Sequence, residues 1–413
     1  MYFPDEMETV YFAKWILSEA GDILENGAVT VSENRIVFVG PRGKARRSPD
    51  DRIVNLGDSL ILPGFINMHT HLEEGVVRGI QKSGEETFAA WSAKKQSRVR
   101  QATSESICTS IHLGIRELLA QGITTVLDSS KTGLSGPILE EQSIRAWVIN
   151  ELSPEDPAQE QDIVRKAISH SKEKSKKTGS GIGPYAIYSL SPESQYEIIN
   201  HRGKDALWAT HMAESAEELQ AFSEKKGDLL FQITRKRPWL FGDTSMGSMN
   251  YAINSGLIPE HAICFHCNYV NGSELDYLAS KNASVVLCHS YMREMGHKSF
   301  PLDAALNREV RICLGTESVT SPGFMGLFDE LFSLKLSYPH ISPAEMIKWV
   351  TINAAEALNM GDSLGTLSKG KLADLIAVRF AHDPNAELLE ELMTEEPEVV
   401  LVVVDGEEVV VNY

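Results

Sequence analysis

Hydrophobic positions in the middle of the chain alternate between a helical spacing and a strand spacing. Ser104 to Gln121 repeats its apolar residues every three or four positions, and the β-branched run Ile123 to Leu127 follows after Gly122. The first pattern predicts a helix and the second a buried strand. Further helix and strand segments are Asp162 to Lys177 with Ile182 to Leu190, Ala206 to Met212 with Ala216 to Lys226, Glu274 to Lys281 with Ala283 to Leu287, and Leu302 to Arg308 with Val310 to Leu314. This alternation over about 300 residues predicts parallel βα units, and a (β/α)8 barrel of the TIM type fits that length.

Both ends of the chain carry a different pattern, in which short β-branched runs are separated by turn residues. The predicted strands are Thr9 to Ala13, Ala28 to Gly40 with a turn at Glu33-Asn34, Ile53 to Leu62, Ala373 to Val378, Val399 to Val404 and Val409 to Val411. Asp405-Gly406 is a hairpin signal between the last two runs. We therefore predict a small β-sandwich domain built from residues 1–60 and 364–413, and a barrel domain over residues 61–363.

Charge and cysteine content limit which partners and which cellular compartment the sequence favours. The formal net charge of −18 disfavours nucleic acid and anionic membranes as partners. No apolar run approaches the roughly 20 residues that span a bilayer. The first eight residues are acidic rather than basic, which argues against a signal peptide. Five cysteines, an odd number, are typical of reduced thiols, so we expect a cytoplasmic protein that acts on a small molecule.

Four of the twelve histidines stand at the ends of predicted strands. His69 and His71 close the apolar segment that begins at Leu62, while His211 and His266 each end a later apolar run. Residues i and i+2 on a strand point to the same face, so the imidazoles of His69 and His71 can converge on one metal ion. Barrel enzymes keep their chemistry at this end of the strands.

Carboxylates accompany these histidines. Glu214 lies three residues after His211, where it can act as a general base and proton shuttle without binding metal itself. Glu317 follows the predicted strand Val310 to Leu314, whereas Glu73-Glu74 reads as part of a loop near the mouth of the site. A single strand-end histidine is more often a hydrogen-bonded structural residue, but the joint pattern favours a site for one divalent ion. Nitrogen and oxygen ligands suit zinc, with iron or manganese as alternatives.

The chain resembles the amidohydrolase superfamily, in its branch of nucleoside and nucleobase deaminases and chlorohydrolases. The matching segments are Leu62-Pro63-Gly64-Phe65-Ile66-Asn67-Met68-His69-Thr70-His71, Arg78-Gly79, His211-Met212-Ala213-Glu214-Ser215, Phe265-His266-Cys267 and Gly365 to Leu375. The resemblance implies that His69, His71, His211 and Glu317 bind the metal, that Glu214 shuttles protons, and that His266 orients the attacking hydroxide with help from Glu317. Two-metal relatives carry a carboxylated lysine in a segment matching Tyr185 to Glu193, which has no lysine here, so one metal ion is implied. Relatives are often dimers or larger, which implies a homo-oligomer.

A narrower resemblance points to a substrate. Gly296-His297 and Phe300-Pro301-Leu302 resemble a bacterial group that includes the aminodeoxyfutalosine deaminases of menaquinone biosynthesis. This implies hydrolytic deamination of a 6-aminopurine nucleoside that resembles aminodeoxyfutalosine, adenosylhomocysteine or methylthioadenosine. Candidate substrate-binding residues are Trp91, Tyr185, His289 and His297. The alternatives are a chlorohydrolase or cyclic amidine or amide hydrolase, and a degenerate homologue that binds a ligand without catalysis.

Three departures from the family pattern bear on these alternatives. The family motif Gly-Thr-Asp-Ser, followed by Ser-Asn, here reads Gly315-Thr316-Glu317-Ser318 and then Ser321-Pro322. The family motif Cys-Pro-x-Ser reads Cys288-His289-Ser290-Tyr291, and many adenosine-type relatives carry histidine at the position of Tyr185. Because glutamate is one methylene longer than aspartate, Glu317 changes the geometry of the catalytic site itself. The other changes affect which substrate the site would accept.

Overall fold

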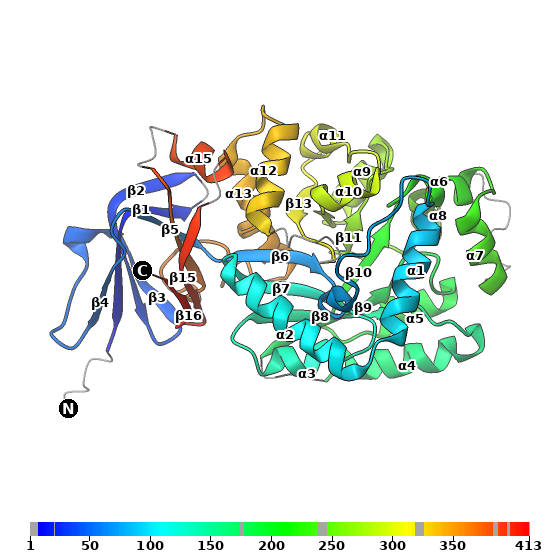
Figure 1. The fold of residues 1–413 in the computed structure, drawn as a ribbon, viewed down its shortest axis with the longest axis horizontal. Coiled ribbons are helices and arrows are strands. Elements are labelled where there is room, and N and C mark those ends of the chain that lie inside the picture. The colour runs from blue at the N-terminus through cyan, green and yellow to red at the C-terminus, as the bar shows by residue number, and fades with distance from the viewer. Residues whose placement is uncertain are drawn as a thin grey trace.

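Figure 1 shows the computed structural model, in which a barrel ringed by helices lies beside a second, strongly twisted sheet. The described residues are 7–19, 21–173, 175, 177–237, 246–318, 326–382, 387–394 and 397–412. The Ser321-Pro322 segment therefore lies outside the described residues. No helix within the described ranges is long and apolar enough to cross a bilayer.

Eight parallel strands, all within the described ranges, form the barrel in the order in which they occur along the chain. They are β6 (Phe65–Thr70), β7 (Ile123–Ser130), β8 (Arg145–Leu152), β9 (Thr178–Pro184), β10 (Leu207–Met212), β11 (Ile263–His266), β12 (Ser284–Leu287) and β13 (Arg311–Leu314). Every residue of β6, β7 and β10 is buried, because side chains fill the barrel and helices cover its outside. The predicted (β/α)8 barrel is confirmed.

The helices cover the barrel and the strand connections (Figure 1). They are α1 (Phe88–Gln101), α2 (Ser104–Ala120), α3 (Ser135–Glu140), α4 (Glu160–His170), α5 (Pro192–His201), α6 (Ala216–Ser223), α7 (Asp228–Lys236), α8 (Ser248–Asn254), α9 (Gly272–Ser280), α10 (His289–Met295), α11 (Leu302–Leu306), α12 (Leu327–Ser337), α13 (Pro343–Trp349), α14 (Ile352–Ala357) and α15 (Leu388–Thr394). Helix α2 follows its prediction closely, because Thr103 caps its start by accepting the N–H of Ser106 and its apolar stripe is buried.

Two predicted elements end six or more residues earlier than expected. The helix predicted to reach Lys177 ends at His170. The strand predicted over Ile182 to Leu190 ends at Pro184, because the following backbone turns out of the sheet, where the Ser189 hydroxyl accepts the N–H of Ala186 at 3.1 Å.

The barrel closes through a seam made by Asn67, His69, Thr316 and Glu317. The backbone N–H groups of Thr316 and Glu317 donate to the carbonyl oxygen of His69 at 2.9 and 3.1 Å. The Asn67 amide spans the same junction, since its Oδ1 accepts the Thr316 N–H at 3.2 Å and its Nδ2 donates to Thr316 Oγ1 at 2.8 Å. The seam therefore places the first and last predicted site residues beside each other.

The two ends of the chain build one mixed sheet, in the order β16-β15-β14-β5-β1-β2-β3, with β4 also paired to β1. Its strands are β1 (Thr9–Glu19), β2 (Asp22–Ser32), β3 (Arg35–Pro41), β4 (Arg52–Asn55), β5 (Ser59–Pro63), β14 (Leu375–Arg379), β15 (Glu398–Val404) and β16 (Glu407–Val411). The segment predicted as one strand from Ile53 is two strands, because Gly57 turns the chain at a φ of +60°. Strand β5 then leads into β6 through Gly64, so this sheet anchors the strand that carries His69 and is followed directly by His71.

Candidate metal centre

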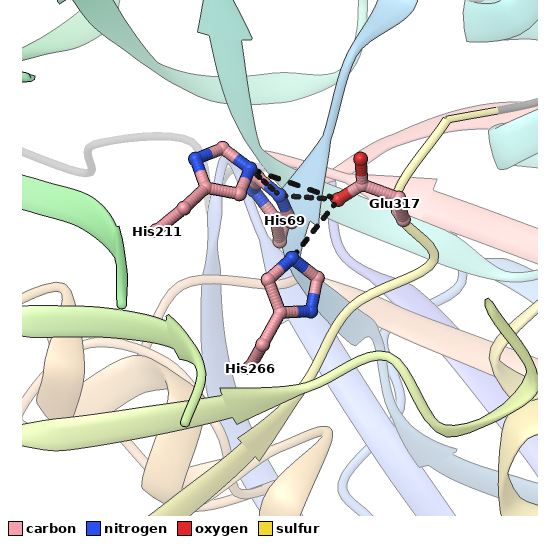
Figure 2. A group of neighbouring side chains, drawn as sticks. All are labelled: His69, His211, His266 and Glu317. Carbon is pink, nitrogen blue, oxygen red and sulfur yellow. Dashed lines mark hydrogen bonds and ion pairs between the residues drawn. The ribbon is translucent and has the colours of Figure 1, made fainter. Parts of the chain in front are cut away.

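Figure 2 shows the side chains of His69, His211, His266 and Glu317 pointing toward one another. One ligand atom from each lies within 4.8 Å of all the others. Glu317 Oε2 lies 2.6 Å from His69 Nε2 and 3.6 Å from His266 Nε2, and His69 Nε2 lies 3.2 Å from His211 Nε2. All four side chains are at most 3% exposed, so they are shielded from bulk solvent.

His71 and Glu214 flank this group. His71 Nε2 lies 3.6 Å from the other oxygen of Glu317, Oε1, and the His71 ring centre lies 4.8 Å from that of His69. Glu214 Oε1 lies 3.7 Å from His266 Nε2. The structure thus brings together all six residues predicted as catalytic or metal-binding.

Two of the imidazoles bind a backbone carbonyl oxygen through Nδ1, which leaves Nε2 directed into the group. His71 Nδ1 lies 3.1 Å from the carbonyl oxygen of Ser129, and His211 Nδ1 lies 2.7 Å from that of Tyr185. Because a carbonyl oxygen only accepts hydrogen bonds, each Nδ1 carries the proton and each Nε2 has a free lone pair. Burial lowers the pKa of both His69 and His211 to about 3, which keeps these imidazoles neutral.

The residues of this group fit a divalent metal ion. His266 Nε2 and Glu317 Oε2 are buried and make no hydrogen bond within the part of the chain that the structure describes. Buried polar atoms are normally satisfied, and converging lone pairs from imidazoles and a carboxylate are what a divalent ion binds. The donor set is the one that zinc, iron and manganese accept.

Hydrogen bonds with the side chains of Glu218 and Asn268 hold the backbone of Glu214 in place. The Glu218 carboxylate accepts the N–H groups of Ala213 and Glu214, both at 2.9 Å, and Asn268 Nδ2 donates to the carbonyl oxygen of Glu214 at 3.0 Å. Burial, reinforced by the carboxylates of Glu317 and Glu218, raises the pKa of Glu214 well above its usual value. Glu214 is therefore suited to hold and release a proton.

Three charged residues beside the centre are missing from the sequence prediction: Lys95, Lys131 and Glu151. Glu73 and Glu74, predicted as loop residues near the mouth of the site, lie in the 3-10 helix Leu72–Val77 and are each 2% exposed. Glu73 turns inward because its Oε2 accepts the N–H groups of Lys131 and Thr132. Lys131 and Glu151 lie at the ends of β7 and β8. The same strand-end position identified the histidines in the sequence, so it could also have identified these two residues.

The predicted substrate-binding residues divide into those near the centre and one that faces away. The Tyr185 ring centre lies 4.6 Å from that of His211, and Tyr185 lines a cavity of about 710 Å³ between α1 and α7. Trp91 is fully buried, and Phe88 packs against both Trp91 and His297. His289 faces α12, where its Nε2 lies 3.0 Å from Ser337 Oγ, because it begins α10 on the side that packs on that helix.

Gly315→Ala is expected to displace His69. A Cβ at Gly315 would lie 2.6 Å from His69 Cβ and 2.8 Å from its backbone nitrogen, which is too close for any Cβ. We expect at least tenfold weaker metal binding and a loss of about 2 kcal/mol of stability, because the seam must open. Metal titration and thermal unfolding measure both effects. Gly136→Ala is the control, since nothing lies within 4 Å of its Cβ position; wild-type metal binding in Gly315→Ala would contradict the expectation.

Comparisons with known proteins agree with this geometry. The sequence model of the Amidohydrolase family matches residues 60–409. A 5-methylthioadenosine/S-adenosylhomocysteine deaminase from Bacillus cytotoxicus is 24% identical over 411 residues, covering 94% of this chain and 89% of the relative. A 5'-deoxyadenosine deaminase from Methanothrix thermoacetophila is 23% identical over 378 residues, covering 87% and 83%.

Two solved structures share the fold over nearly the whole chain. An adenosine deaminase from Xanthomonas campestris with bound zinc has a TM-score of 0.84 at 20% identity, covering 99% of this chain and 94% of the other. The Helicobacter pylori aminofutalosine deaminase in complex with methylthio-coformycin has a TM-score of 0.82 at 22% identity, covering 97% and 100%.

Proposed function

The chain belongs to the amidohydrolase family, and we propose that it is a metal-dependent hydrolytic deaminase of a 6-aminopurine nucleoside. In this reaction, water replaces the 6-amino group of the adenine and ammonia leaves. The proposal is supported by curated relatives that match more than four fifths of the chain and are named as deaminases of methylthioadenosine, adenosylhomocysteine and 5'-deoxyadenosine. Aminodeoxyfutalosine is the first substrate to test, because the segment at Gly296-His297 resembles the deaminases that act on it.

One observation carries the proposal: imidazoles from three barrel strands and the Glu317 carboxylate converge beside Glu214. His69, His71, His211 and Glu317 hold the metal ion, for which zinc is the first candidate. A zinc ion in this position would lower the pKa of a coordinated water toward about 7.

The other residues move protons and orient the reactants. Glu214 takes a proton from the attacking water and delivers it to the ring nitrogen beside the reacting carbon, and its raised pKa suits both transfers. His266 Nε2, which lies within 3.7 Å of the carboxylates of Glu214 and Glu317, orients the attacking oxygen. Tyr185 borders the cavity that receives the nucleoside.

Metal content is the first test. Protein purified without added metal is expected to contain about one zinc or iron per chain by inductively coupled plasma mass spectrometry, and His69→Ala is expected to lose it. This result would show that Glu317 is compatible with metal binding. If wild-type protein contains no metal and takes up none on titration, the alternative of a degenerate homologue that binds a ligand without catalysis replaces the proposal.

A substrate panel then separates the reactions that this fold supports. Ammonia release from aminodeoxyfutalosine, adenosylhomocysteine or methylthioadenosine supports the proposal. Chloride release from a chloro-triazine, without ammonia from any adenine nucleoside, would instead assign a chlorohydrolase. Hydrolysis confined to cyclic amides would assign the remaining alternative.

A further inference from the structure

A buried ion network made by Glu74, Lys95, Lys131 and Glu151 adjoins the candidate metal centre. Lys131 Nζ lies 3.1 Å from Glu74 Oε1 and 3.4 Å from Glu151 Oε2, and Lys95 Nζ lies 2.8 Å from Glu74 Oε2. The side chains of Glu74, Lys95 and Glu151 are at most 3% exposed, and that of Lys131 is 21% exposed. Desolvation of buried ion pairs often outweighs their attraction, so fold stability alone does not explain this network.

Glu151 connects the network to the metal centre. Its Oε1 lies 3.4 Å from His211 Nδ1 and its Oε2 lies 4.0 Å from His71 Nδ1. These three residues form a second group with the spacing of metal ligands. However, both Nδ1 atoms donate to backbone carbonyls, so their lone pairs are not available to a second ion.

The position between Glu74 and Glu151 is nevertheless one that a cation prefers. Two carboxylates face each other across it, and carboxylate oxygens are the ligands that magnesium, manganese and zinc accept. The Lys131 ammonium lies in this position and also 4.5 Å above the ring of Tyr185. The ammonium groups of Lys131 and Lys95 outweigh burial and hold the pKa of Glu74 well below its usual value, whereas burial raises the pKa of Glu151 to about 8.

We propose that the Lys131 ammonium is a resident cation, which takes the place of a second divalent ion and keeps the centre mononuclear. A fixed positive charge between Glu74 and Glu151 satisfies both carboxylates and repels another cation. Burial alone lowers the pKa of Lys131, but the carboxylates of Glu74 and Glu151 outweigh it and raise the pKa above its ordinary value, so the ammonium stays charged. The inference rests on the proposed function in one respect: it assigns the first metal ion to His69, His71, His211 and Glu317.

Lys131→Met tests this assignment through metal stoichiometry. By equilibrium dialysis against manganese, wild-type protein is expected to saturate at about one ion per chain and Lys131→Met at about two. Electron paramagnetic resonance should detect magnetic coupling between two manganese ions in the variant alone. Lys131→Arg keeps the positive charge and should stay at one ion, whereas Lys131→Met/Glu151→Gln removes one carboxylate and should return to one.

The outcomes distinguish this inference from the proposed function. If wild-type protein binds no manganese or zinc, both fail. If folded Lys131→Met still binds one ion, or if wild-type protein binds two, the resident-cation assignment alone fails. Lys131→Gln, which retains a hydrogen-bond donor to Glu74, gives the same readout should Lys131→Met fail to fold by circular dichroism.

Discussion

Glu214→Gln is expected to lower kcat for ammonia release about a thousandfold while metal content stays at the wild-type level. Glutamine has the size of glutamate but cannot take a proton from water and return it. Glu214 also lies outside the group of converging ligand atoms, since its nearest contact there is 3.7 Å from His266 Nε2. Steady-state ammonia release and metal analysis of the same preparation measure both quantities.

The matched control for this variant is Glu217→Gln, on the first turn of α6. Glu217 accepts the N–H of Phe88 at 2.8 Å and does not contact the metal centre among the described residues. We expect kcat within about threefold of wild type for this control, since it leaves the proton pathway intact. Normal turnover in Glu214→Gln would exclude the shuttle role, and loss of metal would instead place Glu214 among the ligands.

Asp128→Asn is expected to raise the free energy of unfolding, relative to wild type, more at pH 8 than at pH 4. Burial, reinforced by the negative charge of Glu73, raises the pKa of Asp128 to about 7, whereas an exposed aspartate titrates near 4. Between these values the native state holds a proton that the unfolded chain releases, so stability falls as the pH rises from 4 to 7. The asparagine removes this dependence, which corresponds to a change of about 4 kcal/mol across the interval.

Urea unfolding of wild type and variant at pH 4, 6 and 8 measures this difference. The amide can still accept the Leu72 N–H, which Asp128 Oδ1 accepts at 2.9 Å, so the local fold should persist. Asp58→Asn, at a side chain that is 84% exposed, serves as the control. A free-energy difference for Asp128→Asn that is the same at all three pH values would contradict the expectation.

Sequence alone predicted the barrel and the convergence of the four histidines, because strand direction determines both. His69 lies near the end of β6 and His71 directly follows that strand, while His211 and His266 lie at the ends of β10 and β11. In a parallel barrel all such ends meet at one rim, so strand periodicity suffices to bring them together. The family assignment is confirmed as well, and the individual roles of the site residues remain predictions.

The buried ion network escaped prediction because its partners come from elements that the pattern leaves ambiguous. The apolar run of strand β8, Ala146 to Ile149, is only four residues long, which is too short to distinguish a strand from a helical segment, and Glu151 lies two residues beyond it. Lys95 is one of several basic residues on α1, and only the packing of that helix over the barrel shows that it faces inward. Likewise, the orientation of His289 depends on the contact between α10 and α12, which no local pattern encodes.

The seam also bears on the stage of synthesis at which the proposed site can bind a metal ion. Its hydrogen bonds join Asn67 to Thr316, which are 249 positions apart, and Glu317 is carried on the same late segment. Contacts between such distant residues form slowly and only after the intervening chain has been made. A nascent chain that has produced His69, His71 and His211 therefore lacks both the closed barrel and the carboxylate. We therefore expect metal loading at the proposed site to be a late step of biogenesis, reserved for chains whose barrel has closed.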